Sequence, residues 1–201
     1  MKTLVNNLAF RHAYQGFFLL LMIAIPNITL GMTTLYNNQT GLTFTKLESW
    51  GVIAINLIIF YLTYLWAKSE GLMTRFRLDL KDAKAIIWGF LTIFLMGVIG
   101  SNLMLLTHTN YHAELQKTLT TTPILPVAIG MITAAFLQEI LFRKWIFTWL
   151  APYSKTAVLV STGLFCLFHM PTNLAYLTLY IGMGLALSMV YQKRENLSAS
   201  I

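Results

Sequence analysis

The sequence predicts an all-α protein: a polytopic bundle of about six transmembrane helices, forming a single transmembrane domain over residues 1–201 with both termini cytoplasmic. Three observations support this class. The chain is 57% hydrophobic and 10% charged, against roughly 45–50% and about 25% in globular proteins. Its mean hydropathy is +0.66, and its basic residues are concentrated in alternate connecting segments. This composition excludes a soluble domain, a disordered chain and a coiled coil, and one cysteine, Cys166, excludes a disulfide scaffold.

Six apolar stretches are long enough, or nearly so, to cross a hydrocarbon layer of about 30 Å as helices. They are residues 17–36, 50–67, 85–106, 124–150, 156–169 and 173–191. The first three carry no charge, and the first is longer than the apolar core of a signal peptide, so we expect it to be a span. The fifth is short and ends before Pro171, which cannot continue a helix. The period-2 pattern of a membrane barrel is not visible, so each span is expected to be a helix.

The basic residues predict the orientation. With both termini inside, 12 of the 14 lysines and arginines fall in inner segments. These inner residues are Lys2, Arg11, Lys68, Arg75, Arg77, Lys81, Lys84, Arg143, Lys144, Lys155, Lys193 and Arg194. Lys46 and Lys117 fall in outer loops, as expected if cytoplasmic loops retain positive charge during insertion. Because no basic patch forms on a soluble face, we expect the lipid bilayer as a partner and no nucleic acid.

Three polar residues near the membrane interior are candidates for chemistry. Glu139 lies within the fourth predicted span, where a carboxylate costs about 2.5–3.5 kcal/mol to insert, and such groups are functional candidates. Arg143 follows four residues later on the same face and can pair with it, as a functional or a purely structural pair. His169 ends the next span, either as a structural hydrogen-bonding group or as a general acid or base acting on water.

The sequence supports no cofactor. His108 and His112, with Glu114, have only a weak resemblance to a zinc site, because their loop offers no further ligand. No motif of a zinc protease, a serine hydrolase or a phosphate-binding loop occurs. A role for a divalent metal therefore stays open but has no support in the residues.

Two segments resemble motifs of the CAAX protease and bacteriocin-processing family, also called the Abi family. The run from Gln138 to Arg143, Gln-Glu-Ile-Leu-Phe-Arg, resembles its Glu-Glu-x-x-x-Arg motif. The run from Phe165 to His169 resembles its second motif, Phe-x-x-x-His, and residues 182–201 resemble the approach to a third, His-x-x-x-Asn. The similarity covers about residues 125–201.

This resemblance implies an intramembrane endopeptidase of the glutamate type, related to type II CAAX prenyl endopeptidases, in a bacterial plasma membrane. Its implied substrates are a membrane peptide, a prenylated protein or a bacteriocin, and its implied roles are bacteriocin processing or self-immunity. The family's first glutamate and its second-motif histidine are thought to activate water, its third motif to stabilise the oxyanion, and its arginine to be structural. Catalytic candidates are therefore Gln138, Glu139, Arg143 and His169.

Two departures from the family pattern argue for weakened or lost activity. Gln138 stands where the first glutamate belongs, and a neutral amide cannot act as a base. Glu139 projects about 100° away from it on an α-helix, so it is not expected to take over. The sequence also reaches Ile201 where the third motif is expected to begin. The alternatives are a non-catalytic bacteriocin immunity or membrane-interaction protein, and a proton-coupled carrier that uses Glu139 and His169 as a relay.

Overall fold

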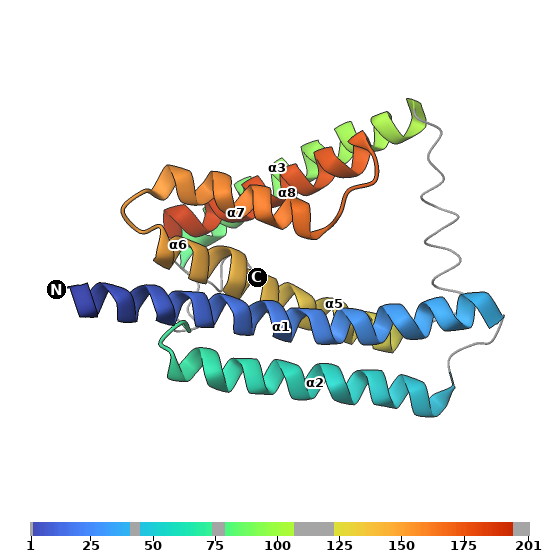
Figure 1. The fold of residues 1–201 in the computed structure, drawn as a ribbon. Coiled ribbons are helices and arrows are strands. Elements are labelled where there is room, and N and C mark those ends of the chain that lie inside the picture. The colour runs from blue at the N-terminus through green and yellow to red at the C-terminus, as the bar shows by residue number, and fades with distance from the viewer. Residues whose placement is uncertain (1, 41–44, 74–78, 107–122, 195–201) are drawn as a thin grey trace. The chain divides into compact units, whose positions relative to one another are not determined.

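The structure, a computed structural model, describes residues 2–40, 45–73, 79–106 and 123–194, and all regular elements in these ranges are helices (Figure 1). In chain order they are α1 (Lys2–Thr40), α2 (Lys46–Ser69), α3 (Leu80–Leu106), α5 (Ile124–Gln138), the π-helix η1 (Glu139–Trp145), α6 (Ile146–Trp149), α7 (Ser154–Phe168) and α8 (Leu174–Arg194). The predicted all-α class is confirmed.

Four helical stretches of the described residues are long and apolar enough to cross a membrane. They are Lys46–Ser69, Leu80–Leu106, Ile124–Trp149 and Leu174–Arg194, and they correspond to the second, third, fourth and sixth predicted spans. The fifth corresponds to α7, whose 15 residues extend only about 23 Å. The first lies within α1, which at 39 residues is much longer than predicted. The count of six spans and the side of the termini stay predictions.

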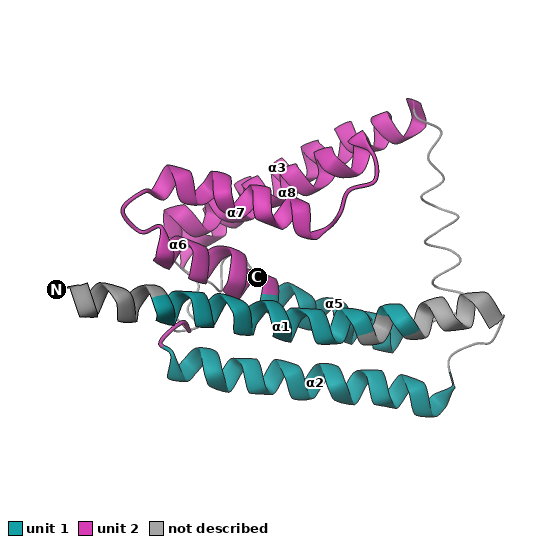
Figure 2. Ribbon diagram, viewed as in Figure 1, with its two compact units in different colours: residues 1–70, 110–137 teal, residues 71–109, 138–201 magenta. Residues whose placement is uncertain are grey.

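The helices belong to two compact units, each built from segments that are separated in sequence (Figure 2). Unit 1 comprises Met1–Glu70 and Asn110–Leu137, and it therefore contains α1, α2 and nearly all of α5. Unit 2 comprises Gly71–Thr109 and Gln138–Ile201, with α3, η1, α6, α7 and α8. All four candidate catalytic residues fall in unit 2.

In unit 1, aromatic rings join the helices. The Phe18 ring on α1 lies 4.5 Å from the Trp66 ring on α2. The Phe60 ring on α2 lies 4.4 Å from the Phe136 ring on α5. Ring pairs at such separations bury large apolar areas and contribute about 0.5–1.5 kcal/mol beyond that burial. Each pair therefore fixes one helix contact of this unit.

In unit 2, glycines allow α3 and α8 to pack closely in opposite directions. A Cβ atom added to Gly89 would lie 2.8 Å from Val190 Cγ2, and one added to Gly100 would lie 2.8 Å from Leu179 Cγ. Residues near the start of α3 thus face residues near the end of α8, and residues near the end of α3 face residues near the start of α8. Small residues let helix backbones approach where lipid supplies no hydrophobic driving force.

Polar contacts complete the packing of α8. The Ser161 hydroxyl on α7 and the Ser188 hydroxyl on α8 are 3.0 Å apart and buried. At the end of α8, Arg194 Nε lies 2.5 Å from Asp82 Oδ1, and Arg194 Nη2 lies 2.9 Å from Asp79 Oδ2. These contacts hold α8 in place, and α8 forms one side of the candidate site.

Candidate active site

The first motif begins at the last residue of α5, Gln138, and continues through a π-helix. The predicted span over residues 124–150 is helical as expected, but η1 separates α5 from α6 within it. A π-turn, with i→i+5 hydrogen bonds, is rare and is frequently found at functional sites. The regular α-helical angles expected across Gln138–Arg143 do not hold within η1, because the widened turn of a π-helix redistributes the side chains.

Glu139 and Arg143 form a buried ion pair. Arg143 Nη1 lies 3.0 Å from Glu139 Oε1. Arg143 is 0% exposed and Glu139 is 3% exposed. The guanidinium also lies over the Phe165 ring, with Cζ 4.7 Å from the ring centroid. Such a cation–π contact is strengthened by desolvation. The pair that the spacing predicts is therefore present, and each charge compensates the other in a place where a lone charge would be costly.

His169 caps the C-terminus of α7 and is oriented by a hydrogen bond. Its Nδ1 lies 2.8 Å from the Phe165 carbonyl oxygen. Because a carbonyl only accepts, Nδ1 carries the hydrogen and donates it, so in the neutral ring Nε2 holds the lone pair. The next residue, Met170, has φ of 44°, which reverses the chain direction directly after the histidine. The helix therefore ends where Pro171 predicted it would.

The Phe165 ring connects the two motifs. It lies under the Arg143 guanidinium and 4.4 Å from the His169 ring centroid. Phe142 from η1 packs edge-on against it at 5.5 Å. The i,i+4 spacing of Phe165 and His169 puts both on one face of α7, so the second motif brings its histidine and its aromatic ring to the ion pair of the first.

The structure brings Glu139, Arg143 and His169 into one neighbourhood of unit 2 and leaves Gln138 at its edge. Gln138 is the last residue of α5, half-buried, and has no part in the ion pair. His108, His112 and Glu114 lie outside the described residues, as does the predicted third-motif region 196–201. Among the residues that the structure describes, no cluster of three or more histidine, cysteine, aspartate or glutamate side chains could hold a metal ion.

Two aromatic residues of this neighbourhood had no signal in the sequence. The Tyr180 ring on α8 packs against the His169 ring at a tilt of 31°, with centroids 4.5 Å apart. Phe142 lies inside the first motif but is one of many phenylalanines in an apolar span. Only the folded arrangement of η1, α7 and α8 reveals either contact. The result is a carboxylate, a guanidinium and an oriented imidazole among aromatic rings, which suits proton transfer in a medium of low dielectric constant.

Comparison with known proteins supports the motif resemblance. Residues 120–201 match the family described as "Type II CAAX prenyl endopeptidase Rce1-like". The chain is also 28% identical over 192 residues to the UPF0177 protein YvdC of Lactococcus lactis subsp. lactis (strain IL1403), covering 92% of this chain and 72% of that protein. No solved structure matches. The segment that holds both motifs, residues 120–201, is thus similar to the Rce1-like type II CAAX prenyl endopeptidases, and the predicted resemblance is confirmed.

Proposed function

We propose that this chain is an intramembrane endopeptidase of the glutamate type, related to the type II CAAX prenyl endopeptidases, with chemistry weakened by Gln138. One observation carries the proposal: Arg143, which pairs with Glu139, and His169 both contact the Phe165 ring within one unit, on the two segments that resemble the family's first and second motifs. The proposed substrates are membrane-bound peptides, including prenylated proteins and bacteriocin precursors, in a bacterial plasma membrane.

In this proposal His169 is the proton acceptor. With Nδ1–H donated to the Phe165 carbonyl, Nε2 is the atom that takes a proton from water as the water attacks a peptide carbonyl. The same nitrogen then returns the proton to the departing amine. Glu139 and Arg143 compensate each other's charge beside the imidazole, so the pair adds no net charge to the place where the proton is transferred.

Gln138 accounts for the proposed weakening. A glutamate at this position would add a second proton acceptor, and a positioned general base contributes roughly 10²–10⁴-fold to a rate. An amide hydrogen-bonds water but cannot remove its proton. The same residue favours the competing proposal, a non-catalytic immunity or membrane-interaction protein that uses the polar neighbourhood to hold a bacteriocin or another membrane peptide.

Cleavage of a probe peptide distinguishes the two proposals. The purified chain, in liposomes, is mixed with a fluorogenic farnesylated peptide and with a fluorogenic membrane-peptide precursor, and kcat/KM is measured. We expect Gln138→Glu to raise kcat/KM by at least about tenfold. In the Gln138→Glu background, His169→Ala should abolish cleavage.

Matched variants control for folding and for charge. Leu167→Ala changes an exposed neighbour of His169 on α7 and should leave the rate unchanged. Gln192→Glu makes the same chemical change as Gln138→Glu near the end of α8, outside the sequence of both motifs, and should also have no effect. If neither wild type nor Gln138→Glu cleaves any probe while both retain native helicity, the endopeptidase proposal fails and the immunity proposal replaces it.

A further inference from the structure

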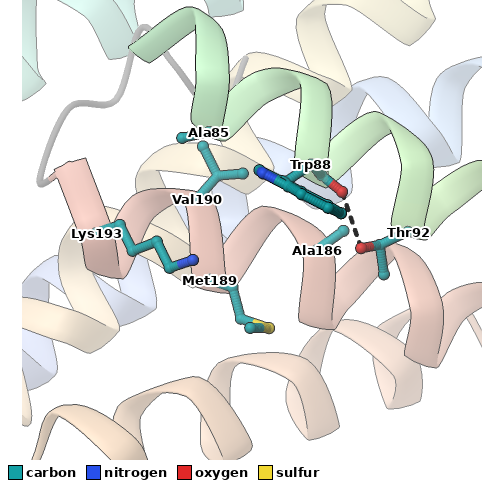
Figure 3. Close-up of a pocket in the computed structure, with 8 residues that line it drawn as sticks. Ala85, Trp88, Thr92, Ala186, Met189, Val190 and Lys193 are labelled. Atoms are coloured by element: carbon teal, nitrogen blue, oxygen red, sulfur yellow. Dashed lines mark hydrogen bonds between the residues drawn. The ribbon is translucent and has the colours of Figure 1, made fainter. Parts of the chain in front are cut away.

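A shallow, open groove lies between α3 and α8, within unit 2 (Figure 3). Its floor consists of small or buried residues, namely Ala85, Gly89, Ala186 and Val190. Gly89 has no side chain, and Val190 fills the space that a Cβ atom at this position would need. The floor of the groove is therefore shallow. The groove therefore offers an apolar channel along two closely packed helices.

The sides of the groove combine apolar surface with a few polar groups at one end. Trp88 and Met189 are 59% and 45% exposed, so their apolar surface is available to a ligand. Thr92 donates its hydroxyl hydrogen to the Trp88 carbonyl oxygen at 2.9 Å, so its polar group is already used. Lys193 is exposed and lies along the groove (Figure 3). The polar groups left for a ligand are the Lys193 ammonium and the Trp88 indole N–H.

This end of unit 2 carries unbalanced positive charge. Its two described carboxylates, Asp79 and Asp82, are both bound by Arg194. Lys193 forms no ion pair with any described residue. Lys81 is also exposed, and it precedes Trp88 by seven residues, about two helical turns, which places it on the same face of α3. A ligand that enters here thus meets lysines whose charge no carboxylate of the described residues offsets.

We propose that this groove binds one anionic phospholipid, with an acyl chain on the Ala85–Gly89–Ala186 floor and the phosphate at Lys193. The apolar floor suits an acyl chain, and the lysines suit a lipid phosphate that carries no compensating choline or ethanolamine charge. Trp88 lies near the start of the third predicted span, residues 85–106, and tryptophan is commonly found near such ends, where its indole N–H can donate to a lipid headgroup. This inference is independent of the endopeptidase proposal, because it involves none of the four candidate catalytic residues.

Native mass spectrometry of the full chain, released from detergent and titrated with phosphatidylglycerol, tests the proposal. Each basic residue near an anionic headgroup accounts for about a fivefold change in affinity. Lys193→Ala should therefore weaken the first phosphatidylglycerol site by about fivefold, and Lys193→Arg should restore it. Trp88→Ala should weaken binding of phosphatidylglycerol and phosphatidylcholine alike. The matched control is Lys155→Ala, which removes an equally exposed lysine at the start of α7, outside the groove.

Three outcomes would overturn the proposal. One is an equal loss of affinity in Lys155→Ala and Lys193→Ala, which would indicate general surface attraction. A second is equal affinity of the wild-type chain for phosphatidylcholine and phosphatidylglycerol. The third is displacement of the lipid by soluble glycerol phosphate at comparable concentration, which would indicate a simple anion site without an acyl-chain groove. Because Lys193 and Trp88 are exposed, circular dichroism should show unchanged helicity in each variant.

Discussion

At the residue scale, the Glu139–Arg143 pair combines a structural role with a chemical one. Both side chains are enclosed, and their charged atoms are 3.0 Å apart. In such surroundings the loss of one charge leaves the other uncompensated, whereas the loss of both is often tolerated. A single substitution of Glu139 thus alters stability as well as chemistry, so a loss of function in that variant alone does not identify a catalytic residue.

The ion pair predicts a non-additive effect on stability. Glu139→Leu should lower the free energy of unfolding by about 3–5 kcal/mol, because Arg143 stays buried without its partner. The double variant Glu139→Leu, Arg143→Leu should recover most of this loss. Urea or SDS denaturation of the reconstituted protein measures both, with Lys155→Leu as an exposed control. Equal losses in the single and double variants would contradict the compensating role of the pair.

At the element scale, the contact between α3 and α8 positions both the candidate site and the lipid groove. Both Tyr180, which packs against His169, and Lys193, which lies in the groove, are on α8. Their positions depend on how closely α8 approaches α3, and glycines set that distance. A Cβ atom at Gly182 would clash with Met96 Cβ and Cγ, whereas one at Gly97 on α3 would meet nothing within 4 Å.

Two glycine substitutions should therefore act in opposite directions. Gly182→Ala should destabilise the protein by about 1–3 kcal/mol, as overpacking of a filled contact does. Gly97→Ala should leave stability unchanged or raise it by about 0.4–1 kcal/mol, because it restricts the unfolded chain at no steric cost. Thermal unfolding in one detergent compares the two. Adding Met96→Ala to Gly182→Ala should restore part of the stability, and an equal effect of both alanines would show that close packing is unimportant here.

Another element-scale contact, between α1 and α2, should depend on pH. The Gln15 amide and the Arg11 guanidinium donate to Glu70 Oε2 at 2.7 and 2.8 Å. These hydrogen bonds hold the pKa of the Glu70 carboxyl below its usual value of 4.5. Because the folded-state pKa is lowered, the stabilisation is fully present above pH 4.5 and is lost as the pH falls through the folded-state pKa.

Thermal unfolding of wild type and Glu70→Gln between pH 3 and 7 checks this dependence. Wild type should unfold at the higher temperature above about pH 5, and the difference should shrink as the pH falls below 4.5. Added salt should also reduce it, because the Arg11 side chain is 57% exposed. A difference that stays constant across the whole range would exclude Glu70 ionisation as its source.

At the scale of the whole molecule, the distribution of positive charge predicts how the chain lies in the membrane. In a Cys166→Ala background, we expect Lys155→Cys to react with a membrane-impermeant maleimide only in inverted vesicles. Thr45→Cys, in the predicted outer segment, should react in intact cells. Both residues are exposed, so if a cysteine at either position does not react, the membrane separates it from the reagent. Labelling of both from the same side would overturn the six-span topology.

The sequence by itself determines the helical membrane class and the local pairing of charges. Burial of backbone polar groups in lipid requires helices, so composition and the length of apolar runs are sufficient to predict them. The Glu139–Arg143 pair and the Phe165–His169 face follow from spacings of four residues within one helix. Such features depend on neighbours along the chain, and they also carry the family resemblance over the C-terminal part.

Other features arise only in the folded chain. Three features have no local signature in the sequence: the π-helix at Glu139–Trp145, the contact of Tyr180 with His169 and the groove between α3 and α8. Gly89 and Val190, which meet in that groove, are about a hundred residues apart in sequence, and many apolar helices of this chain could have paired instead. Side-chain volume and the fit of one helix against another choose among those pairings, and hydrophobic patterning does not encode that choice.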